Sequence, residues 1–309
     1  MSRIHDALTR RATDEKSKSL TPGVEPATWE APADSAASGP PITASGGLAR
    51  DLQGERPADS EVFQAISDKC PQSEWSPDPA MILFYGEEFR TRGSEEFRTL
   101  RSRLELVRQR KPLQKLLVTS PMPGEGKSFL AANLAQVIVW QRERHVLLID
   151  ADLRSSRLHR ALGVPAAPGL SDYLAGKVDE FAVVKRGPLD NFFFVPGGAP
   201  VANASELIAN GRFQALLNRL AVAFDWIIID SPPVIPIADA RLMAQSCDGV
   251  LLVLQADETS AGLAQQAYRE FRGAPFVGVV LNQVDPHSTY GYDYYYPKDT
   301  AVPAKKKAR

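Results

Sequence analysis

Long apolar runs, cysteine and net charge are all scarce in this chain, and each shortage excludes a class of protein. No apolar stretch approaches the roughly 18–20 residues that a helix needs to cross a bilayer, and the N-terminus lacks the apolar core of a secretory signal. The two cysteines, Cys70 and Cys247, have no metal-ligand spacing, which indicates free thiols in a reducing compartment. A formal net charge of −1 over 309 residues gives no general attraction to nucleic acid, so no nucleic-acid partner is expected. These absences predict a cytosolic protein that reaches a membrane only through a partner.

The composition changes along the chain and suggests four segments. Nine of the 24 prolines fall in the first 80 residues, among Ala, Ser and Gly, so residues 13–80 are predicted to be a disordered linker. Residues 1–12 form either a short amphipathic docking helix or a frayed terminus, and the sequence leaves both open. Residues 81–286 carry the pattern of a folded domain. Residues 287–309 are predicted to be a flexible tail with a tyrosine cluster and a basic end.

Within residues 81–286, short apolar runs alternate with helical stretches. Six runs are typical of buried strands: "KLLVTS", "HVLLIDAD", "FFFVPG", "DWIIIDS", "GVLLVLQAD" and "FVGVVLNQV". A helix is predicted over residues 94–110 with Ser94 as its N-cap, and further helices are predicted from Lys127, Ser155, Ser205, Ala238 and Ser260. This alternation predicts an α/β fold with a doubly wound, mainly parallel sheet, whose ligand lies beyond the carboxyl ends of the strands.

The first strand is followed by "SPMPGEGKS", a glycine-rich turn that leads into a helix, as in P-loop NTPases. Such a turn surrounds phosphate oxygens with backbone N–H groups, Lys127 reaches the β- and γ-phosphates, and Ser128 ligates Mg²⁺. Pro121 replaces the first glycine of the strict motif, but the strand before it and the helix after it support the assignment. Asn282, after the last strand, is a candidate adenine contact or a plain loop asparagine. The predicted nucleotide-binding residues of the loop are Gly124, Glu125, Gly126, Lys127, Ser128 and Phe129.

Carboxylates follow two further strands of the predicted sheet. Asp150 and Asp152 lie two residues apart and project to the same side of an extended segment. Asp230 ends the run "WIIID", as a Walker B acid does. Because the carboxyl ends of parallel strands meet at one edge, these acids and Lys127 should converge on one Mg·ATP site. Asp152 and Asp230, with Ser128, are the candidate Mg²⁺ ligands, and Asp150 or Asp152 is the candidate base.

These segments together resemble a known family. "VTSPMPGEGKS", "VLLIDADLR" and "WIIIDSPP" are similar to the Walker A, Walker A′ and Walker B elements of the bacterial tyrosine kinases of the CpsD/CapB type. The similarity covers roughly residues 85–296 and includes the tyrosine-rich tail. The chain departs from many of these relatives where "DLRSSR" stands in place of "DLRRP", which leaves the roles of Arg154 and Arg157 open.

The resemblance implies an ATP- and Mg²⁺-dependent protein-tyrosine kinase that controls capsule or exopolysaccharide polymerisation and export. It implies recruitment to the inner face of the plasma membrane by the cytoplasmic tail of a separate transmembrane chain-length regulator, and a phosphotyrosine phosphatase that reverses the reaction. A stripe of Glu95, Arg98 and Arg101 implies ring-like self-association, although such a stripe is also typical of a solvated helix face. The implied phosphoacceptors are Tyr290, Tyr292, Tyr294, Tyr295 and Tyr296.

Two other functions remain as alternatives. A Min/Par-type ATPase switch has a second lysine early in its loop, where this chain has Met122, and such a switch has no use for a tyrosine cluster. The other alternative is a non-catalytic adaptor in which ATP binding and the charge of the tail gate the membrane partner; the presence of Lys127 and all three acids argues against it.

Overall fold

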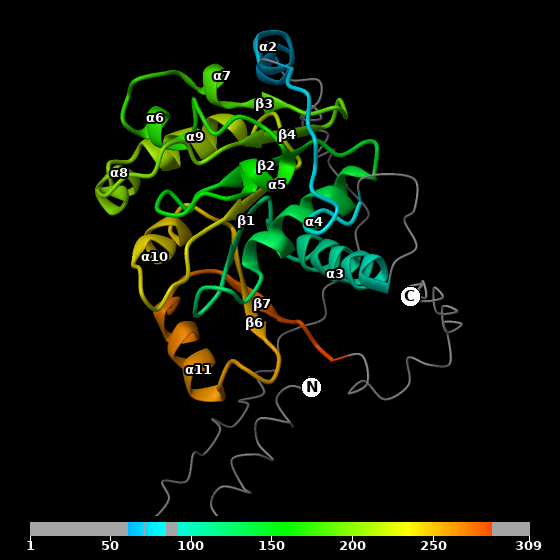
Figure 1. Cartoon of the computed structure of the whole chain (residues 1–309), viewed down its shortest axis with the longest axis vertical. Coiled ribbons are helices and arrows are strands. Elements are labelled where there is room, and N and C mark those ends of the chain that lie inside the picture. Colours follow the sequence, from blue (N-terminus) through cyan, green and yellow to red (C-terminus); the bar gives the residue numbers. More distant parts are fainter. Residues whose placement is uncertain (1–60, 71, 85–91, 286–309) are drawn as a thin grey trace, which may run out of the picture. The chain divides into compact units, whose positions relative to one another are not determined.

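The chain folds around a seven-stranded sheet that lies between two layers of helices (Figure 1); the computed structural model describes residues 61–70, 72–84 and 92–285. The strand order is β3-β4-β2-β5-β1-β6-β7, with β3 antiparallel to β4 and every other neighbouring pair parallel. All six predicted strands are present, and the two-residue edge strand β3 is an addition. The strands are β1 (Lys115–Thr119), β2 (Val146–Asp150), β3 (Lys185–Arg186), β4 (Phe192–Val195), β5 (Trp226–Asp230), β6 (Gly249–Gln255) and β7 (Phe276–Asn282).

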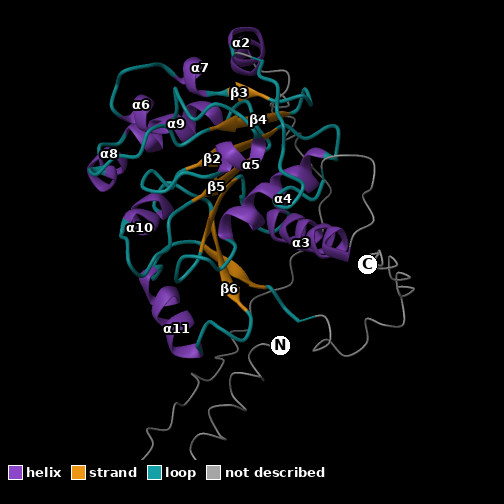
Figure 2. Ribbon diagram, in the orientation of Figure 1, coloured by secondary structure: helices purple, strands orange, loops and turns teal. Residues whose placement is uncertain are grey.

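The helices alternate with the strands along the chain (Figure 2), which confirms the predicted α/β class. Ser94 is not the N-cap of its helix, because the helix already begins at Arg92 and Ser94 lies buried within its first turn. The helix predicted from Ser155 begins at Leu158, since residues 155–157 are held in a loop by contacts described below. The helices are α2 (Glu61–Lys69), α3 (Arg92–Arg108), α4 (Lys127–Val139), α5 (Leu158–Leu162), α6 (Leu170–Leu174), α7 (Glu180–Val183), α8 (Ala204–Ala209), α9 (Arg212–Leu220), α10 (Asp239–Ala244) and α11 (Ala261–Glu270).

Apolar side chains cover both faces of the sheet, because its central strands β1, β2 and β5 consist of continuous Val, Ile and Leu runs. Helices α3, α4 and α5 contribute to the cluster on one face. Helices α2, α6, α7, α8, α9, α10 and α11 contribute to the cluster on the other face. The apolar side chains of α3 that take part in the first of these clusters are Phe97, Leu100, Leu104 and Val107.

Residues 61–70 and 72–84, the N-terminal strap, correct the predicted linker boundary. The prediction of a disordered linker up to residue 80 is wrong for this segment, because Ile66 and Trp75 are both buried. Ile66 packs on one face of the sheet and Trp75 on the other, so the strap passes from one layer to the other. On the way Gln72 forms a bridge to Arg186 of β3 and covers that edge. Proline frequency failed as a guide here because one short helix and a few well-placed apolar side chains suffice to anchor the segment.

Several predictions fall outside the described residues. They concern the N-terminal segment 1–12, the linker up to residue 60 and the tyrosine cluster at 290–296. Within the described part, Cys70 and Cys247 are free thiols, as predicted, and the structure adds that both are buried. No helix in that part is both long enough and apolar enough to cross a membrane.

Candidate active site

The glycine-rich loop connects β1 to α4 and owes its shape to two glycines in the left-handed region. Gly124 has φ 91° and Gly126 has φ 88°, a backbone conformation that residues with a Cβ rarely adopt. At Gly126 space is also limited, because an added Cβ would lie 2.0 Å from Nδ2 of Asn282. The loop therefore brings the N-terminus of α4, with its unpaired N–H groups, to the carboxyl edge of the sheet.

The side chain of Glu125 turns back into the protein and fixes the loop. Its carboxylate accepts a hydrogen bond from the N–H of Met122 at 2.8 Å and another from the hydroxyl of Thr259. Asn282 donates to the Glu125 carbonyl at 3.0 Å, and Gln283 donates to the Gly124 carbonyl at 3.4 Å. Glu125 thus offers a nucleotide its backbone and not its carboxylate, and Asn282 contacts the loop itself.

The ring of Phe129, like the carboxylate of Glu125, makes its contacts within the protein. Its ring packs toward Phe97 of α3, with 5.9 Å between ring centroids, and belongs to the apolar cluster under the helix layer. Only its backbone N–H, in the first turn of α4, remains suited to phosphate.

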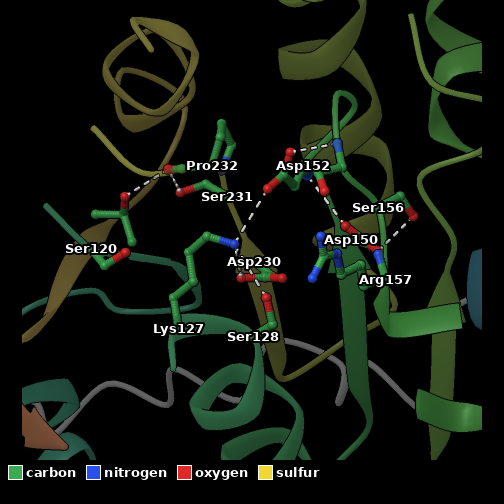
Figure 3. Close-up of polar contacts among 12 residues, drawn as sticks. Ser120, Lys127, Ser128, Asp150, Asp152, Ser156, Arg157, Asp230, Ser231 and Pro232 are labelled. Atoms are coloured by element: carbon green, nitrogen blue, oxygen red, sulfur yellow. Dashed lines mark hydrogen bonds and ion pairs between the residues drawn. The ribbon is translucent and has the colours of Figure 1, made fainter. Parts of the chain in front are cut away.

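Lys127 lies between two carboxylates at the carboxyl edge of the sheet (Figure 3). Its Nζ is 3.4 Å from Oδ2 of Asp152 and 3.7 Å from Oδ1 of Asp230. Asp152 follows β2 and Asp230 ends β5, which is hydrogen-bonded to β1 and β2. The structure thus brings together Lys127, Asp152 and Asp230, three of the four side chains that the sequence predicted to converge; the fourth, Asp150, is described below.

Burial and charge act against each other in this cluster. Burial, opposed by Lys127, raises the pKa of Asp230 to about 7. Burial by itself would lower the pKa of Lys127, but Asp230, Asp152 and Asp150 together outweigh it and leave the pKa raised. Lys127 is therefore held as a cation, whereas burial makes Asp150 and Asp230 harder to ionise than they are in water.

This donor set fits a divalent cation that is bound jointly with a nucleotide. Oδ1 of Asp230 is buried and has no hydrogen-bond partner among the described residues, while the Ser128 hydroxyl, in the same cluster, accepts a hydrogen bond from Nζ of Lys127 at 3.2 Å (Figure 3). Carboxylate and hydroxyl oxygens are the ligands that Mg²⁺ prefers. No group of three or more His, Cys, Asp or Glu side chains in the described ranges is suited to hold a metal alone. Phosphate oxygens would therefore complete the set, which is the usual arrangement for Mg²⁺.

Asp150 is fully buried at the end of β2 and anchors the loop that follows it. Its Oδ2 accepts from the hydroxyl of Ser156 at 2.7 Å and from the N–H groups of Arg157 at 3.1 Å and Leu158 at 3.0 Å. Its Oδ1 accepts from the N–H of Asp152 at 3.3 Å. Burial raises the pKa of Asp150, and the hydrogen bonds from Ser156 and Leu158 oppose that rise.

The same loop is attached to the far side of the site through Arg154. The guanidinium donates to both oxygens of Asp239, at 2.8 and 3.3 Å, and to the hydroxyl of Ser205 at 3.1 Å. Asp239 is fully buried in the first turn of α10. Sequence reasoning missed Asp239, Ser156 and Thr259 because each lies between 6 and 134 residues from its partner.

The predicted self-association stripe lies on α3. Arg98 forms an ion pair with Glu95 one turn earlier. Arg101 donates to the carbonyl of Val137 at 2.7 Å, near the end of α4. The Arg101 guanidinium therefore already has a hydrogen-bond acceptor in its own chain, whether or not it also contacts a second copy.

Comparison with known proteins agrees with this geometry. Residues 116–296, more than half of the chain, match the CobQ/CobB/MinD/ParA nucleotide binding domain. The tyrosine-protein kinase YwqD of Bacillus subtilis is 32% identical over 204 residues, which cover 64% of this chain and 85% of YwqD. The chain belongs to the bacterial tyrosine kinases of this nucleotide-binding family.

Other members of the bacterial tyrosine kinases support the assignment. The kinase domain of the Escherichia coli tyrosine kinase ETK has a TM-score of 0.60 and 32% identity, over 65% of this chain and 80% of that domain. The EpsB proteins of two Ralstonia species are 37% and 36% identical over 202 residues, or 65% of this chain. The chain spans only 27% of the length of those two relatives. The predicted family, P-loop fold and nucleotide-binding capacity are confirmed.

Proposed function

We propose that this chain is an ATP-dependent protein-tyrosine autokinase whose substrate is its own tyrosine cluster at residues 290–296. The observation that carries the proposal is the position of Lys127 between Asp152 and Asp230 at the P-loop. A buried cation with adjacent acids at a helix N-terminus is suited to hold a triphosphate and to stabilise charge on it. The relatives named tyrosine-protein kinases support tyrosine as the acceptor.

Each group at the site has a distinct role in the proposed transfer. Lys127 and the loop N–H groups neutralise the charge that develops on the β- and γ-phosphates. Bound Mg²⁺ supplies further charge neutralisation, and Ser128, Asp152 and Asp230 would hold it. Asn282 fixes the loop, and contact between its side chain and the adenine stays part of the proposal.

A base must also assist the acceptor, because a tyrosine hydroxyl has a pKa near ~10. Asp152 is the better candidate, since it is 7% exposed whereas Asp150 is fully buried. The four donors on Asp150 also leave its carboxylate little freedom to meet a substrate. Asp150 remains the alternative.

The proposal includes partners that the family resemblance implies. They are the cytoplasmic tail of a transmembrane chain-length regulator, which recruits and activates the kinase at the inner membrane face, a phosphotyrosine phosphatase, and further copies of the chain in a ring. Capsule or exopolysaccharide assembly is the process they would control. The ring is tested by light scattering of Arg98→Ala/Arg101→Ala, with Arg103→Ala as a control on the same helix. Assembly of the double variant to the size of wild type would refute the role of the stripe.

The activity is tested by an anti-phosphotyrosine blot of the full chain with ATP, Mg²⁺ and the activating tail. Lys127→Met and a variant with phenylalanine at all five tyrosines should both lose the signal. Lys177→Met is the matched control, because the Lys177 side chain is 70% exposed and distant from the loop in sequence. A signal that survives Lys127→Met would refute the catalytic assignment. ATP hydrolysis without any phosphotyrosine would instead favour a Min/Par-type switch.

A further inference from the structure

The buried carboxylate of Asp150 depends on one side-chain donor. Three of its four hydrogen bonds come from backbone N–H groups of residues 152–158, which any sequence with this loop path supplies. The fourth comes from the hydroxyl of Ser156, and at 2.7 Å it is the shortest of the four. The strength of this anchor is therefore set by the residue type at position 156.

The neighbouring strand end holds that hydroxyl in place. Gly197 follows β4, and a Cβ added there would lie 2.7 Å from both Cβ and Oγ of Ser156 and 3.3 Å from the carbonyl oxygen of Asp150. Contacts this short force a neighbour to move. The absence of a side chain at Gly197 thus provides the space in which Ser156 reaches Asp150. On its other side, Oγ of Ser156 lies 3.3 Å from Nδ1 of His159, which gives the hydroxyl a second polar neighbour.

The anchored loop also carries the groups that face the phosphate site. Asp152 lies inside it, and its Oδ2 is 3.4 Å from Nζ of Lys127. The N–H of Ser155 donates to Oδ1 of the same carboxylate at 3.0 Å. Movement of residues 152–156 would therefore displace Asp152 from Lys127 without disturbing the glycine-rich loop, which is fixed separately through Glu125.

We propose that Ser156 is a positioning residue for phosphoryl transfer, acting through Asp150 to hold Asp152 against Lys127, with Gly197 as the space that permits it. The role rests on the proposed kinase function. Ser156 touches neither nucleotide nor acceptor in this arrangement, so its effect belongs to the rate of transfer and not to ATP binding.

The test compares Ser156→Ala with Ser155→Ala in the full chain. Ser156→Ala should lower the rate of phosphotyrosine formation about tenfold, the effect expected for a lost hydrogen bond to a charged group. The KM for ATP and the affinity for a fluorescent ATP analogue should stay within about twofold, because the P-loop is intact. Ser155→Ala should form phosphotyrosine at the wild-type rate, because the hydrogen bond from residue 155 to Asp152 comes from the backbone N–H, which alanine retains.

Gly197→Ala provides a second route to the same contact. It leaves the hydroxyl in the chain but displaces it, so the rate should fall as in Ser156→Ala. The double variant should be no slower than the slower single variant, because both changes break one interaction.

Four outcomes decide whether Ser156 is a positioning residue. A Ser156→Ala rate equal to that of an active wild type overturns the inference, and so does a parallel loss of rate, ATP binding and thermal stability, which would mark a purely structural role. A wild type that forms no phosphotyrosine while it still binds the ATP analogue would refute the proposed function itself. A reduced rate with ATP binding retained supports the positioning role, including where the melting temperature falls by the small amount expected for one lost hydrogen bond.

Discussion

Replacement of Asp230 by Asn should make the metal-free protein more stable while it removes activity. Asp150, Asp152 and Asp230 lie around Lys127, so ionising all three acids places more negative than positive charge in the buried site. Asp230 is the most strongly affected member with a defined pKa, raised by burial from 3.8 to about 7. An uncharged amide of similar shape removes part of this unfavourable charge.

The size of the expected gain in stability follows from the raised pKa of Asp230. A difference between 3.8 and about 7 corresponds to roughly 4 kcal/mol of unfolding free energy at a pH above both values. The two other carboxylates share this cost with Asp230, and an asparagine must still satisfy its own amide, so the expected gain is about 2 kcal/mol.

The pH dependence has a defined sign. Below about pH 4 the Asp230 carboxyl is protonated in both the folded and the unfolded chain, so it does not lower the free energy of unfolding. From pH 4 to about 7 the folded protein binds the proton more tightly, so wild type loses stability as the pH rises through this window. The advantage of Asp230→Asn should therefore be largest at pH 8 and clearly smaller at pH 5.

The assay is urea unfolding at pH 8 and pH 5 without nucleotide or metal, followed by thermal unfolding with Mg²⁺ and an ATP analogue. Ligand should raise the melting temperature of wild type more than that of the variant. Asp225→Asn is the control at the opposite end of β5, where Asp225 pairs with Arg144 at 3.0 Å, and it should lose about 1–2 kcal/mol. A less stable Asp230→Asn protein at pH 8, or an advantage that does not shrink at pH 5, would refute the charge argument.

Two further substitutions test the supports of the P-loop. Asn133→Ala should lower the free energy of unfolding in urea by about 2–3 kcal/mol, because this fully buried amide of α4 makes three hydrogen bonds, two of them to the N-terminal strap. Asn218→Ala, at an exposed position, is the control and should change little. A loss no greater than that of the control would show that the strap does not depend on the Asn133 amide. Gly126→Ala should weaken binding of an ATP analogue at least tenfold, because the added Cβ would collide with Asn282. Gly211→Ala, at φ 84° but in open space, is the control and should lower stability by only about 1 kcal/mol and leave binding unchanged. Equal effects of the two changes on binding would contradict the steric explanation.

The parts of the site that follow strands were predictable from the sequence. Asp152 and Asp230 lie at or just after the ends of apolar runs, Lys127 follows another such run through the glycine-rich loop, and parallel strands bring these positions to one edge. The glycines of the loop were predictable for the same local reason, since only glycine accepts their backbone conformation without strain.

Side-chain directions were not predictable in the same way. The sequence placed Glu125 and Phe129 in the nucleotide-binding loop, but the carboxylate meets Thr259 and the ring meets Phe97. The sequence also assigned residues up to 80 to a linker, although Ile66 and Trp75 of this segment are core residues. In each case the partner is distant along the chain and leaves no periodic pattern near the residue it contacts.

The sequence by itself determined the fold class, the nucleotide-binding loop and the set of charged groups at the carboxyl edge, because strand periodicity and glycine stereochemistry are local properties. Only the tertiary structure decided which of those groups are free to act. It committed Asp150 to Ser156, turned Glu125 inward and paired Arg154 with Asp239. The physical reason is that a buried charge takes whichever donors the packed elements bring within hydrogen-bond distance, and that choice is made across the fold and not along the chain.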